Sequence, residues 1–443
     1  MESRSGRRRL RSSSPTEDRI STLPDDLLLL ILARLRSIAA AVRTSVLSRR
    51  WSGSGGLWTR LHEIVFRDIT FPSLEAALGR VVDPPAVSLL EIRVPDVHRP
   101  GTETNVGGLG FNSLLRAAAQ LAPEEFVFRF PWDLTDRSLV VDMPCFPRTT
   151  SIVLVNFFLF LRVPDGVDFL ALETLSLSGR LPDLDPWLSC CPRLHALRLR
   201  RVFSEGELRV ISASLHELSI FRLYQRMHGI NIVAPMLKQL TMSFFSSGAS
   251  ISVLAPMVEK VSWDCRYSKP SIVFGLWRLE QVTLQMGETQ GHVPTLQICA
   301  HATSSILGTE EHTFAEEIEK HMIAGFSVLE LHLTTNGHAF GALVFHLLKM
   351  VRICGSIRRL KVVLERSTVK EECPFDCFCE PWNWRSKTIS LSALEEVEIN
   401  GFQGYGQEID FLKLISQCAP MLKKTTMMLS EETSPSNDES AKI

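Results

Sequence analysis

A short apolar pattern that returns at nearly equal steps is the feature that most constrains how this chain can fold. The pattern is LxxLxL, where L stands for an apolar residue. Its regular copies are LETLSL from Leu172, LHALRL from Leu194, LHELSI from Leu215, LKQLTM from Leu237, VEKVSW from Val258 and LEQVTL from Leu279. The successive steps are 22, 21, 22, 21 and 21 residues. Five near-equal steps predict a stack of equivalent units, because self-similarity at a fixed period is the signature of repeat architectures.

The period and the strand pattern are those of a leucine-rich repeat, in which each unit adds one short strand to a parallel sheet. Later copies follow at irregular steps of 49, 29 and 37 residues, as VLELHL from Val328, IRRLKV from Ile357 and LEEVEI from Leu394. A proline stands two residues before an aliphatic residue at Pro192, Pro235, Pro256 and Pro420. Proline fixes φ and lacks an N–H group, so it suits the point where a connecting segment ends and a strand begins.

Residues that alternate with the inward aliphatic residues are expected on the concave face of such a stack, in three rows across the strands. The rows are Thr174, Ala196, Glu217, Gln239, Lys260 and Gln281; Ser176, Arg198, Ser219, Thr241, Ser262 and Thr283; and Ser178, Arg200, Phe221, Ser243, Asp264 and Gln285. A broad polar face suits another protein better than a small substrate. The predicted target-binding residues are Arg198, Arg200, Glu217, Phe221, Gln239, Thr241, Lys260 and Asp264. The alternative is that these are only solvated strand positions.

A strong helix start opens the first block, STLPDDLLLLILARL. Thr22 suits a helix cap, Pro24 suits a place near the first helical position, and Asp25 and Asp26 complement the positive end of the helix dipole. The apolar stripe consists of Leu27, Leu28, Ile31, Leu32 and Leu35, and Leu29 and Leu30 widen it to almost the whole circumference. A helix that is apolar on two sides needs two partners to pack against.

The segment LPDDLLLLILARL, the following AAVRTSVLSRRW and the later Leu57–Trp58 together resemble the F-box of plant F-box proteins with leucine-rich repeats. The resemblance covers residues 18 to about 66. It implies a small helical bundle that docks on the Skp adaptor subunit, and through it on a cullin, in an SCF ubiquitin ligase. The adaptor contacts that it implies are Leu23, Pro24, Leu27, Leu28, Ile31, Leu32, Val42, Val46, Leu47 and Trp51, with Ser45, Ser48 and Arg49 as a polar rim. The alternative is that these residues form the internal core of the bundle.

One departure from the family pattern follows Trp51. The stretch WSGSGGLW places Trp58 seven positions after Trp51, where the family has a shorter step. We expect residues 52–56 to lengthen a flexible loop near the end of the bundle.

A second resemblance lies at the C-terminus, where residues from about 380 to 430 resemble the FBD segment of plant F-box proteins. The matching positions are Trp384, Leu394, Glu395, Val397, Gly401, Phe402, Gly404, Glu408, Phe411, Leu412, Cys418, Pro420 and Leu422. The pattern predicts a strand, a glycine turn and an amphipathic helix. With Ile409, Leu412, Leu414 and Ile415 toward the sheet, this helix would cap the open end of the array.

The composition indicates which classes of partner are not expected and in which cellular compartment the chain is expected. The formal net charge is −1, from 48 basic and 49 acidic residues, so neither nucleic acid nor a membrane surface is indicated as a partner. Ten cysteines without a signal-peptide core predict a reducing, intracellular location, in the nucleus, the cytoplasm or both. The most apolar run, residues 152–161, is too short to span a membrane and is expected to be a buried strand with its turn. The cluster RRRLR in the first tail is either a nuclear import signal or only solubilising.

Three candidate chemical sites lack the residues or the spacing that their chemistry requires. Cys373, Cys377 and Cys379 are thiols, but they lack the paired spacing of a structural zinc site. The glycine-rich stretch 105–115 lacks the lysine of a P-loop and is expected to be an ordinary loop before a helix. His312 and His321 do not have metal-ligand spacing and are expected to be surface histidines on a polar helix. We therefore expect no catalytic residue, no metal and no cofactor.

These observations predict an α/β chain with an F-box helical bundle, a leucine-rich-repeat solenoid with a parallel sheet on its concave face, and an FBD cap. The expected boundaries are 1–17 for a disordered basic tail, 18–66 for the F-box, 67–372 for the repeats (most regular over 169–290), 373–430 for the Cys-rich loop and FBD segment, and 431–443 for a disordered tail. The expected function is that of a non-catalytic subunit that recruits an unknown target protein to an SCF ligase. The alternatives are a repeat-based binding module that does not engage a ligase and, more remotely, a thiol or zinc hydrolase that uses the Cys373 cluster.

Overall fold

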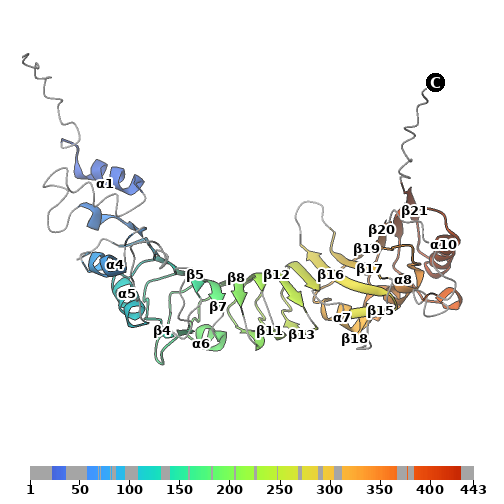
Figure 1. The fold of residues 1–443 in the computed structure, drawn as a ribbon, viewed down its shortest axis with the longest axis horizontal. Helices are drawn as coiled ribbons and strands as arrows, with labels where there is room; N and C mark the ends of the chain where they lie inside the picture. The colour runs from blue at the N-terminus through green and yellow to red at the C-terminus, as the bar shows by residue number, and fades with distance from the viewer. Residues whose placement is uncertain are drawn as a thin grey trace, which may run out of the picture. The chain divides into compact units, whose positions relative to one another are not determined.

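The structure is a computed structural model whose described part is mixed α/β and mostly sheet (Figure 1). The chain divides into two compact units, Met1–Thr149 and Thr150–Ile443. Within the described ranges, no helix is both long and apolar enough to cross a membrane. The described residues are 22–35, 57–67, 69, 71–79, 81, 86–94, 108–130, 140–157, 160–180, 183–203, 206–223, 227–246, 248–267, 272–287, 293–303, 312–366, 377 and 384–430.

The first unit alternates parallel strands with helices. Its elements are α1 (Asp25–Arg34), the 3₁₀ helix η2 (Leu57–Arg60), β1 (Glu63–Phe66), α4 (Phe71–Leu78), β2 (Leu89–Arg93), α5 (Gly108–Gln120), β3 (Glu125–Arg129) and β4 (Val140–Asp142). Strand β2 lies between β1 and β3 and pairs in parallel with both. Helices α4 and α5 form the crossovers that parallel pairing requires.

Helix α5 confirms the helix expected with the glycine-rich stretch, but it begins earlier than expected, within the stretch itself. The helix begins at Gly108, and its residues Phe111, Leu114, Leu115 and Ala118 are buried. Their spacing of three, four and seven residues places them on one face of a helix. This apolar face accounts for a helix that begins among glycines.

The second unit begins with a row of parallel strands. Its first elements are β5 (Ser151–Phe157), β6 (Phe160–Arg162), β7 (Thr174–Arg180), α6 (Leu184–Ser189), β8 (Ala196–Phe203), β9 (Gly206–Ile211), β10 (Glu217–Leu223), β11 (Met227–Val233), β12 (Gln239–Ser246), β13 (Ser250–Leu254) and β14 (Lys260–Tyr267). Strands β5, β7, β8, β10, β12 and β14 pair in parallel in that order. The run of apolar residues 152–161 includes β5, as expected for a buried strand.

Equivalent positions of successive copies of the sequence pattern are paired in this sheet. One line of paired residues, all of them buried, consists of Leu175, Leu197, Leu218, Leu240 and Val261. Strands β9, β11 and β13 pair in parallel in a separate sheet, which Figure 1 shows opposite β8 and β12. Inward side chains of both layers are buried, such as Leu197 and Leu218 in one sheet and Val210 and Ile232 in the other.

The prolines lie in tight turns that precede the strands, as their positions predict. In four turns the N–H of the leading aliphatic residue donates to the carbonyl three residues earlier, at 3.1 to 3.2 Å, with proline in the second position. Proline favours this position because its φ is already that of the turn. The donors are Leu194, Leu237, Val258 and Leu422.

The sixth regular copy is not a further parallel strand, and this prediction was wrong. After β14, the chain forms β15 (Ile272–Phe274), β16 (Trp277–Met286) and β17 (Thr295–Ala302), and β16 pairs antiparallel with β14, β15 and β17. The reversal occurs at Gly275, whose φ of 58° suits the tight turn between β15 and β16. The step of 21 residues to Leu279 therefore coincides with a change of direction.

Parallel pairing resumes in the last part of the chain. The remaining elements are β18 (His312–Thr313), α7 (Phe314–Lys320), β19 (Val328–Thr334), α8 (Gly341–Leu348), α9 (Val351–Cys354), β20 (Arg359–Glu365), η3 (Trp384–Ser386), β21 (Glu396–Phe402), α10 (Gly406–Cys418) and β22 (Lys424–Leu429). Strands β17, β19, β20, β21 and β22 pair in parallel in that order. The three irregular copies of the apolar pattern are thus strands β19, β20 and β21, as predicted.

The FBD helix exists, but its inner face differs from the prediction. In α10, Leu414 and Ile415 are buried as expected, whereas Ile409 is exposed and Leu412 is half-buried. The additional buried positions are Glu408, Phe411 and Cys418. Met427, Met428 and Leu429 on β22 are exposed, which shows that the helix does not cover the last strand of the sheet.

Candidate functional site

Helix α1 presents an apolar face to its surroundings. Pro24 occupies the N-cap position, so Thr22 lies outside the helix and not at its cap as expected. Asp25 and Asp26 lie in the first turn and Arg34 in the last, which suits the helix dipole. Leu28 and Leu32 are buried, whereas the exposed large side chains are Leu27, Leu30, Ile31 and Leu35, at 41 to 52% exposure. We call these four exposed residues the α1 apolar face.

The predicted adaptor contacts are therefore divided among different environments. Leu27 and Ile31 are exposed, Pro24 is exposed and Leu23 is half-buried, while Leu28 and Leu32 pack inside the unit. The other members, Val42, Val46, Leu47 and Trp51, lie outside the described residues, as do the polar rim and residues 52–56. Strand β1 occupies residues 63–66, at the end of the predicted F-box range.

The predicted target-binding residues lie together on one face of strands β8, β10, β12 and β14. In the first row Ala196 pairs with Glu217, Glu217 with Gln239, and Gln239 with Lys260. The other two rows are formed in the same way, so the three rows are confirmed from β7 to β14. Their last members are displaced, because antiparallel β16 sets Gln281, Thr283 and Gln285 opposite Arg266, Asp264 and Ser262.

Polar contacts link neighbouring strands across this face. Both Nε and Nη2 of Arg198 donate to the carboxylate of Glu217 at 3.1 Å, a bidentate pair that fixes the orientation of both side chains. Asp264 accepts hydrogen bonds from Ser243 at 3.3 Å and from Gln281 at 2.6 Å. The face is therefore ordered by its own contacts, and the remaining exposed side chains project from a defined surface.

Sequence reasoning missed several exposed residues at the carboxyl ends of the same strands. Arg201 and Arg222 are exposed and have positive φ, of 50° and 57°. Each occurs where the register shifts beside a neighbouring strand, which marks a β-bulge. Phe203 and Phe245 are exposed as well. The available signal for a bulge was the break in the alternation of inward aliphatic residues, where two consecutive exposed residues, RR in β8 and FR in β10, precede the next aliphatic residue.

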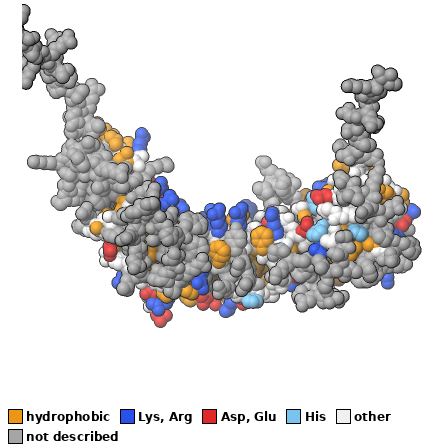
Figure 2. Space-filling view, viewed as in Figure 1, with side chains coloured by type: hydrophobic (Ala, Val, Ile, Leu, Met, Phe, Trp, Pro, Cys, Tyr) orange, Lys and Arg blue, Asp and Glu red, His pale blue; other side chains and the backbone are white. Residues whose placement is uncertain are grey.

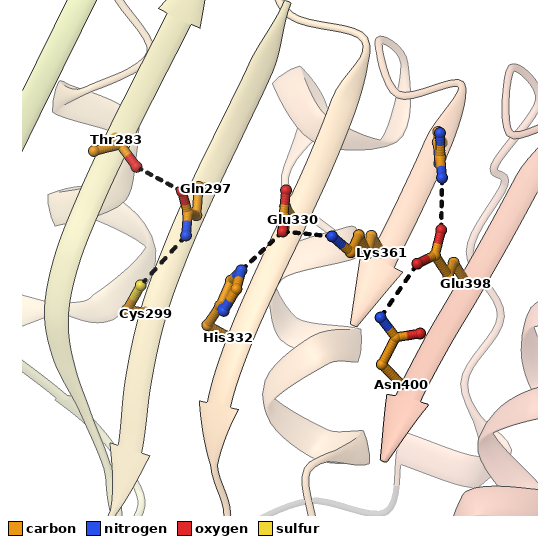
Figure 3. A network of polar contacts seen from close by, with 9 residues as sticks. Thr283, Gln297, Cys299, Glu330, His332, Lys361, Glu398 and Asn400 are labelled. Carbon is orange, nitrogen blue, oxygen red and sulfur yellow. Dashed lines mark hydrogen bonds and ion pairs between the residues drawn. The ribbon is translucent and has the colours of Figure 1, made fainter. Parts of the chain in front are cut away.

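A second set of polar contacts crosses the last part of the sheet (Figure 3). Glu330 on β19 accepts hydrogen bonds from Lys361 on β20 at 2.9 Å and from His332 at 2.8 Å. Partial burial would raise the pKa of Glu330, but the hydrogen bonds and charges of these two partners outweigh it and lower the pKa. Glu330 is therefore held as a carboxylate between two donors.

Glu398 on β21 has a similar arrangement, with Arg359 at 2.5 Å and Asn400 at 3.2 Å (Figure 3). Its pKa is lowered because the hydrogen bonds from Arg359 and Asn400 outweigh the effect of burial. Thr283 donates to Gln297 at 3.3 Å, and the amide of Gln297 lies 3.9 Å from the Sγ of Cys299. Burial raises the pKa of the Cys299 thiol to about 11, so this cysteine is a thiol at neutral pH.

His321 is not a surface residue, contrary to the prediction. It follows α7 and is completely buried, where its Nδ1 accepts from the indole N–H of Trp263 at 2.9 Å and its Nε2 lies 2.5 Å from the hydroxyl of Tyr267. Tyr267 donates to the buried carboxylate of Glu317 at 2.9 Å, and Lys320 donates to the same carboxylate at 2.7 Å. Indole only donates, so the imidazole carries its proton on Nε2 and donates it to Tyr267.

Burial sets the ionisation of this network. It lowers the pKa of His321 to about 3, with a further contribution from the charge of Lys320. Burial also raises the pKa of Tyr267, with the charges of neighbouring groups acting in the same direction. The neutral imidazole therefore joins α7 to β14 by hydrogen bonds. We assign it a structural role at the place where the sheet changes direction. The side chain of His312 lies outside the described residues.

The FBD turn is organised by the buried carboxylate of Glu408. This carboxylate pairs with the guanidinium of Arg366 and accepts the backbone N–H groups of Gln403 and Gly404 at 2.9 and 2.8 Å. Arg366 also donates to the carbonyl of Gly401 at 3.1 to 3.2 Å. The glycines and the glutamate of the segment thus form one compact turn.

The cysteine cluster is described only in part. The Sγ of Cys377 lies 3.3 Å from the Nδ1 of His338, whereas Cys373 and Cys379 lie outside the described residues. No group of three or more histidine, cysteine or acidic residues that could hold a metal ion occurs among the side chains that the structure places. The α1 apolar face and the outward face of the sheet are two candidate binding surfaces.

Comparison with known proteins identifies one segment of the chain. A family model described as FBD matches residues 390–427, which confirms the FBD part of the predicted resemblance. The matched segment contains β21, α10 and the Glu408 turn between them. Searches of curated proteins and of solved structures find no match.

Proposed function

We propose that this chain is a non-catalytic substrate-recognition subunit of an SCF ubiquitin ligase. In this proposal residues 18–66 form an F-box bundle that docks on a Skp adaptor, and through it on a cullin. The following strands form a leucine-rich-repeat solenoid that holds a target protein. The chain acts inside the cell, in the nucleus, the cytoplasm or both, and needs no cofactor.

The observation that carries this proposal is the α1 apolar face. Three large apolar side chains on a helix of ten residues, and a fourth on its C-cap residue Leu35, remain exposed, while Leu28 and Leu32 are buried. This arrangement fits a helix with two apolar partners, one inside the unit and one outside it. Because the same residues resemble an F-box, we infer that the outside partner is the adaptor. The FBD match supports the assignment to F-box proteins.

Proximity is the mechanism that this function requires. A ligase subunit that binds the adaptor and the target at once raises the effective concentration of target lysines near the conjugating enzyme. The covalent chemistry then belongs to other subunits. The chain contributes two binding surfaces, the α1 apolar face and the outward face of the sheet.

A pull-down with purified Skp adaptor tests the docking step. We expect the wild type to retain the adaptor and the double variant Leu27→Asp, Ile31→Asp to lose it by at least about 100-fold. The reason is that each half-exposed side chain has about 1 kcal/mol of burial still to gain, and a buried carboxylate adds its own desolvation cost. The matched control is Leu254→Asp, Val351→Asp, which places the same charges on exposed apolar positions elsewhere. Equal recovery of the adaptor by both double variants would refute docking through this face.

A second candidate is a binding module that has lost the ligase and only sequesters its partner. The longer step from Trp51 to Trp58 favours this possibility. Deletion of three residues from 52–56 distinguishes the two. If the shortened variant binds the adaptor and the wild type does not, the sequestering function is supported.

A further inference from the structure

The parallel strands β7, β8, β10, β12 and β14 are strongly basic in a chain whose formal net charge is −1. Their residues include two carboxylates and seven basic side chains, a net formal charge of +5. The basic residues are Arg180, Arg198, Arg200, Arg201, Arg222, Lys260 and Arg266. A concentration of one sign of charge on one surface raises the local concentration of a partner with the opposite sign.

The two carboxylates are already satisfied by neighbouring cations. Glu217 is bound by Arg198, and Asp264 lies 3.7 Å from Arg266. Arg200, Arg201 and Arg222 are exposed and form no ion pair with any carboxylate that the structure describes. These three arginines are therefore available to an external anion.

The bulges give two of these arginines an unusual backbone. A residue other than glycine costs about 1–2 kcal/mol in the left-handed region, and both Arg201 and Arg222 lie there. Bulges commonly re-aim a side chain, and strained backbone is concentrated at sites of function. Arg201 and Arg222 share this backbone conformation on the neighbouring strands β8 and β10, so both residues lie at the edge formed by the carboxyl ends of these strands.

Aromatic side chains alternate with the arginines along this edge. Phe203, Phe221 and Phe245 are 40 to 47% exposed. In the register of the sheet Phe203 is opposite Arg180, Phe221 is opposite Arg200, and Phe245 is opposite Arg266. Figure 2 shows hydrophobic side chains beside Lys or Arg side chains over this part of the sheet. We call Phe203, Phe221 and Phe245, together with Arg200, Arg201 and Arg222, the Arg–Phe edge.

We propose that the Arg–Phe edge binds an extended segment of a partner protein that is rich in Asp and Glu and carries apolar side chains between them. The strands lie about 4.8 Å apart, so the edge from β7 to β14 extends about 19 Å, the length of about six extended residues. Carboxylates of such a segment meet Arg200, Arg201 and Arg222. Its apolar side chains pack on the exposed phenylalanine rings.

Charge distribution favours a peptide over single-stranded nucleic acid, which also uses arginine and aromatic side chains. The ion pairs of Glu217 with Arg198 and of Asp264 with Arg266 interrupt the positive surface, so the arginines without a described ion pair are separate sites, which suit spaced carboxylates better than a continuous phosphate backbone. Beside these ion pairs, Gln285 and Ser262 offer amide and hydroxyl groups that suit a peptide main chain. The inference rests on the proposed assignment of this face to target recognition.

Fluorescence anisotropy on the full chain tests the proposal. The probe is a fluorescein-labelled peptide of four Glu-Asp-Phe repeats, and the comparison ligands are four Lys-Arg-Phe repeats and a twelve-nucleotide thymidine strand. We expect the acidic peptide alone to bind and its affinity to fall at least fivefold between 50 and 300 mM KCl, about the change expected from screening of several ion pairs. The variant Arg201→Asn, Arg222→Asn should bind at least tenfold more weakly, because asparagine tolerates the left-handed backbone but carries no charge.

The matched control is Arg209→Asn, Arg352→Asn, which removes the same charge from exposed positions on β9 and α9 and should bind as the wild type does. No binding of the acidic peptide, equal weakening by both double variants, or tighter binding of the thymidine strand would each overturn the proposal. If circular dichroism shows that the Arg201→Asn, Arg222→Asn variant is unfolded, the salt dependence and the ligand comparison on the wild type still test whether the edge binds the acidic peptide. Recovery of the adaptor in the pull-down is a separate measurement, so failure of this inference and failure of docking are distinguishable.

Discussion

Acid should weaken the second unit through His321, and the size of the effect follows from its burial. The imidazole is neutral in the folded chain, with a pKa lowered to about 3, whereas the unfolded chain has the ordinary value of about 6.5. Below pH 6.5 the unfolded state binds a proton that the folded state does not bind until about pH 3. The free energy of unfolding therefore falls with decreasing pH across this window, by about 1.4 kcal/mol per pH unit.

Between pH 7.5 and pH 4.5 this single group should remove about 2.7 kcal/mol from the free energy of unfolding. Urea unfolding followed by tryptophan fluorescence measures the change, since Trp263 donates its N–H to His321 and reports on the same site. The comparison is with His321→Gln, whose amide can accept from Trp263 and donate to Tyr267 but does not titrate. The variant should be less stable at pH 7.5, by about 1–3 kcal/mol, because its geometry is less suited to both partners.

The difference between the two proteins isolates the histidine, because all other titrating groups are shared. The wild type should lose about 2.7 kcal/mol more than the variant between the two pH values. The stability gap between them should therefore close, or reverse, in acid. Parallel pH dependences for the wild type and His321→Gln would show that the imidazole is not held neutral, and the account of the buried network would be refuted.

Two further predictions concern the FBD turn and the first helix. Gly401→Ala should destabilise the chain by more than about 1–2 kcal/mol, because φ is 80° and the new Cβ would lie 2.4 Å from the carbonyl oxygen of Leu364. Gly404 has the same φ but no such neighbour, so Gly404→Ala should lose less stability in urea unfolding. Equal losses of stability in the two variants would contradict the clash. Leu28→Ala should cost about 2–5 kcal/mol through loss of buried volume, whereas Leu27→Ala, at an exposed position, should cost less than about 1 kcal/mol. Hydrogen exchange of residues 25–34 measures the second pair, and equal loss of protection in both variants would show that the burial of this helix is wrongly assigned.

The repeat period predicted the register of the first parallel strands because two regularities act together. Alternation of apolar and polar residues decides which side chains of β8 or β10 face inward, and the step of 21 or 22 residues brings equivalent positions such as Leu197 and Leu218 into pairing. Both regularities are local to each copy. They predict strands and their outward rows without knowledge of any distant contact.

The same pattern does not predict the direction of a strand. An alternating sequence places the same residues inward whether it is read forward or backward, so the copy from Leu279 looks identical in either orientation. The turn at Gly275 and the pairing of β16 with both β14 and β17 decide the direction. The sequence shows a break in alternation at the bulges, but the extra residue itself is defined only against a partner strand.

His321 shows that local sequence does not predict the burial of a single side chain. Its immediate neighbours, Glu319 and Lys320, are charged and suggest a solvated helix end. Its hydrogen-bond partners Trp263 and Tyr267 are 58 and 54 residues away in the sequence. Burial of this side chain is a property of the packed unit and not of its local pattern.

Local sequence patterns predicted the apolar helix α1, the strand of each copy, the proline turns and the glycine turn of the FBD segment, because each of these depends on residues within one turn or one strand. The tertiary structure alone decided which leucines of α1 remain exposed, where the sheet reverses and which arginines meet phenylalanines at its edge. These outcomes depend on contacts between residues far apart in the chain. A local pattern constrains what a segment can become, and only packing decides which of its faces is left for a partner.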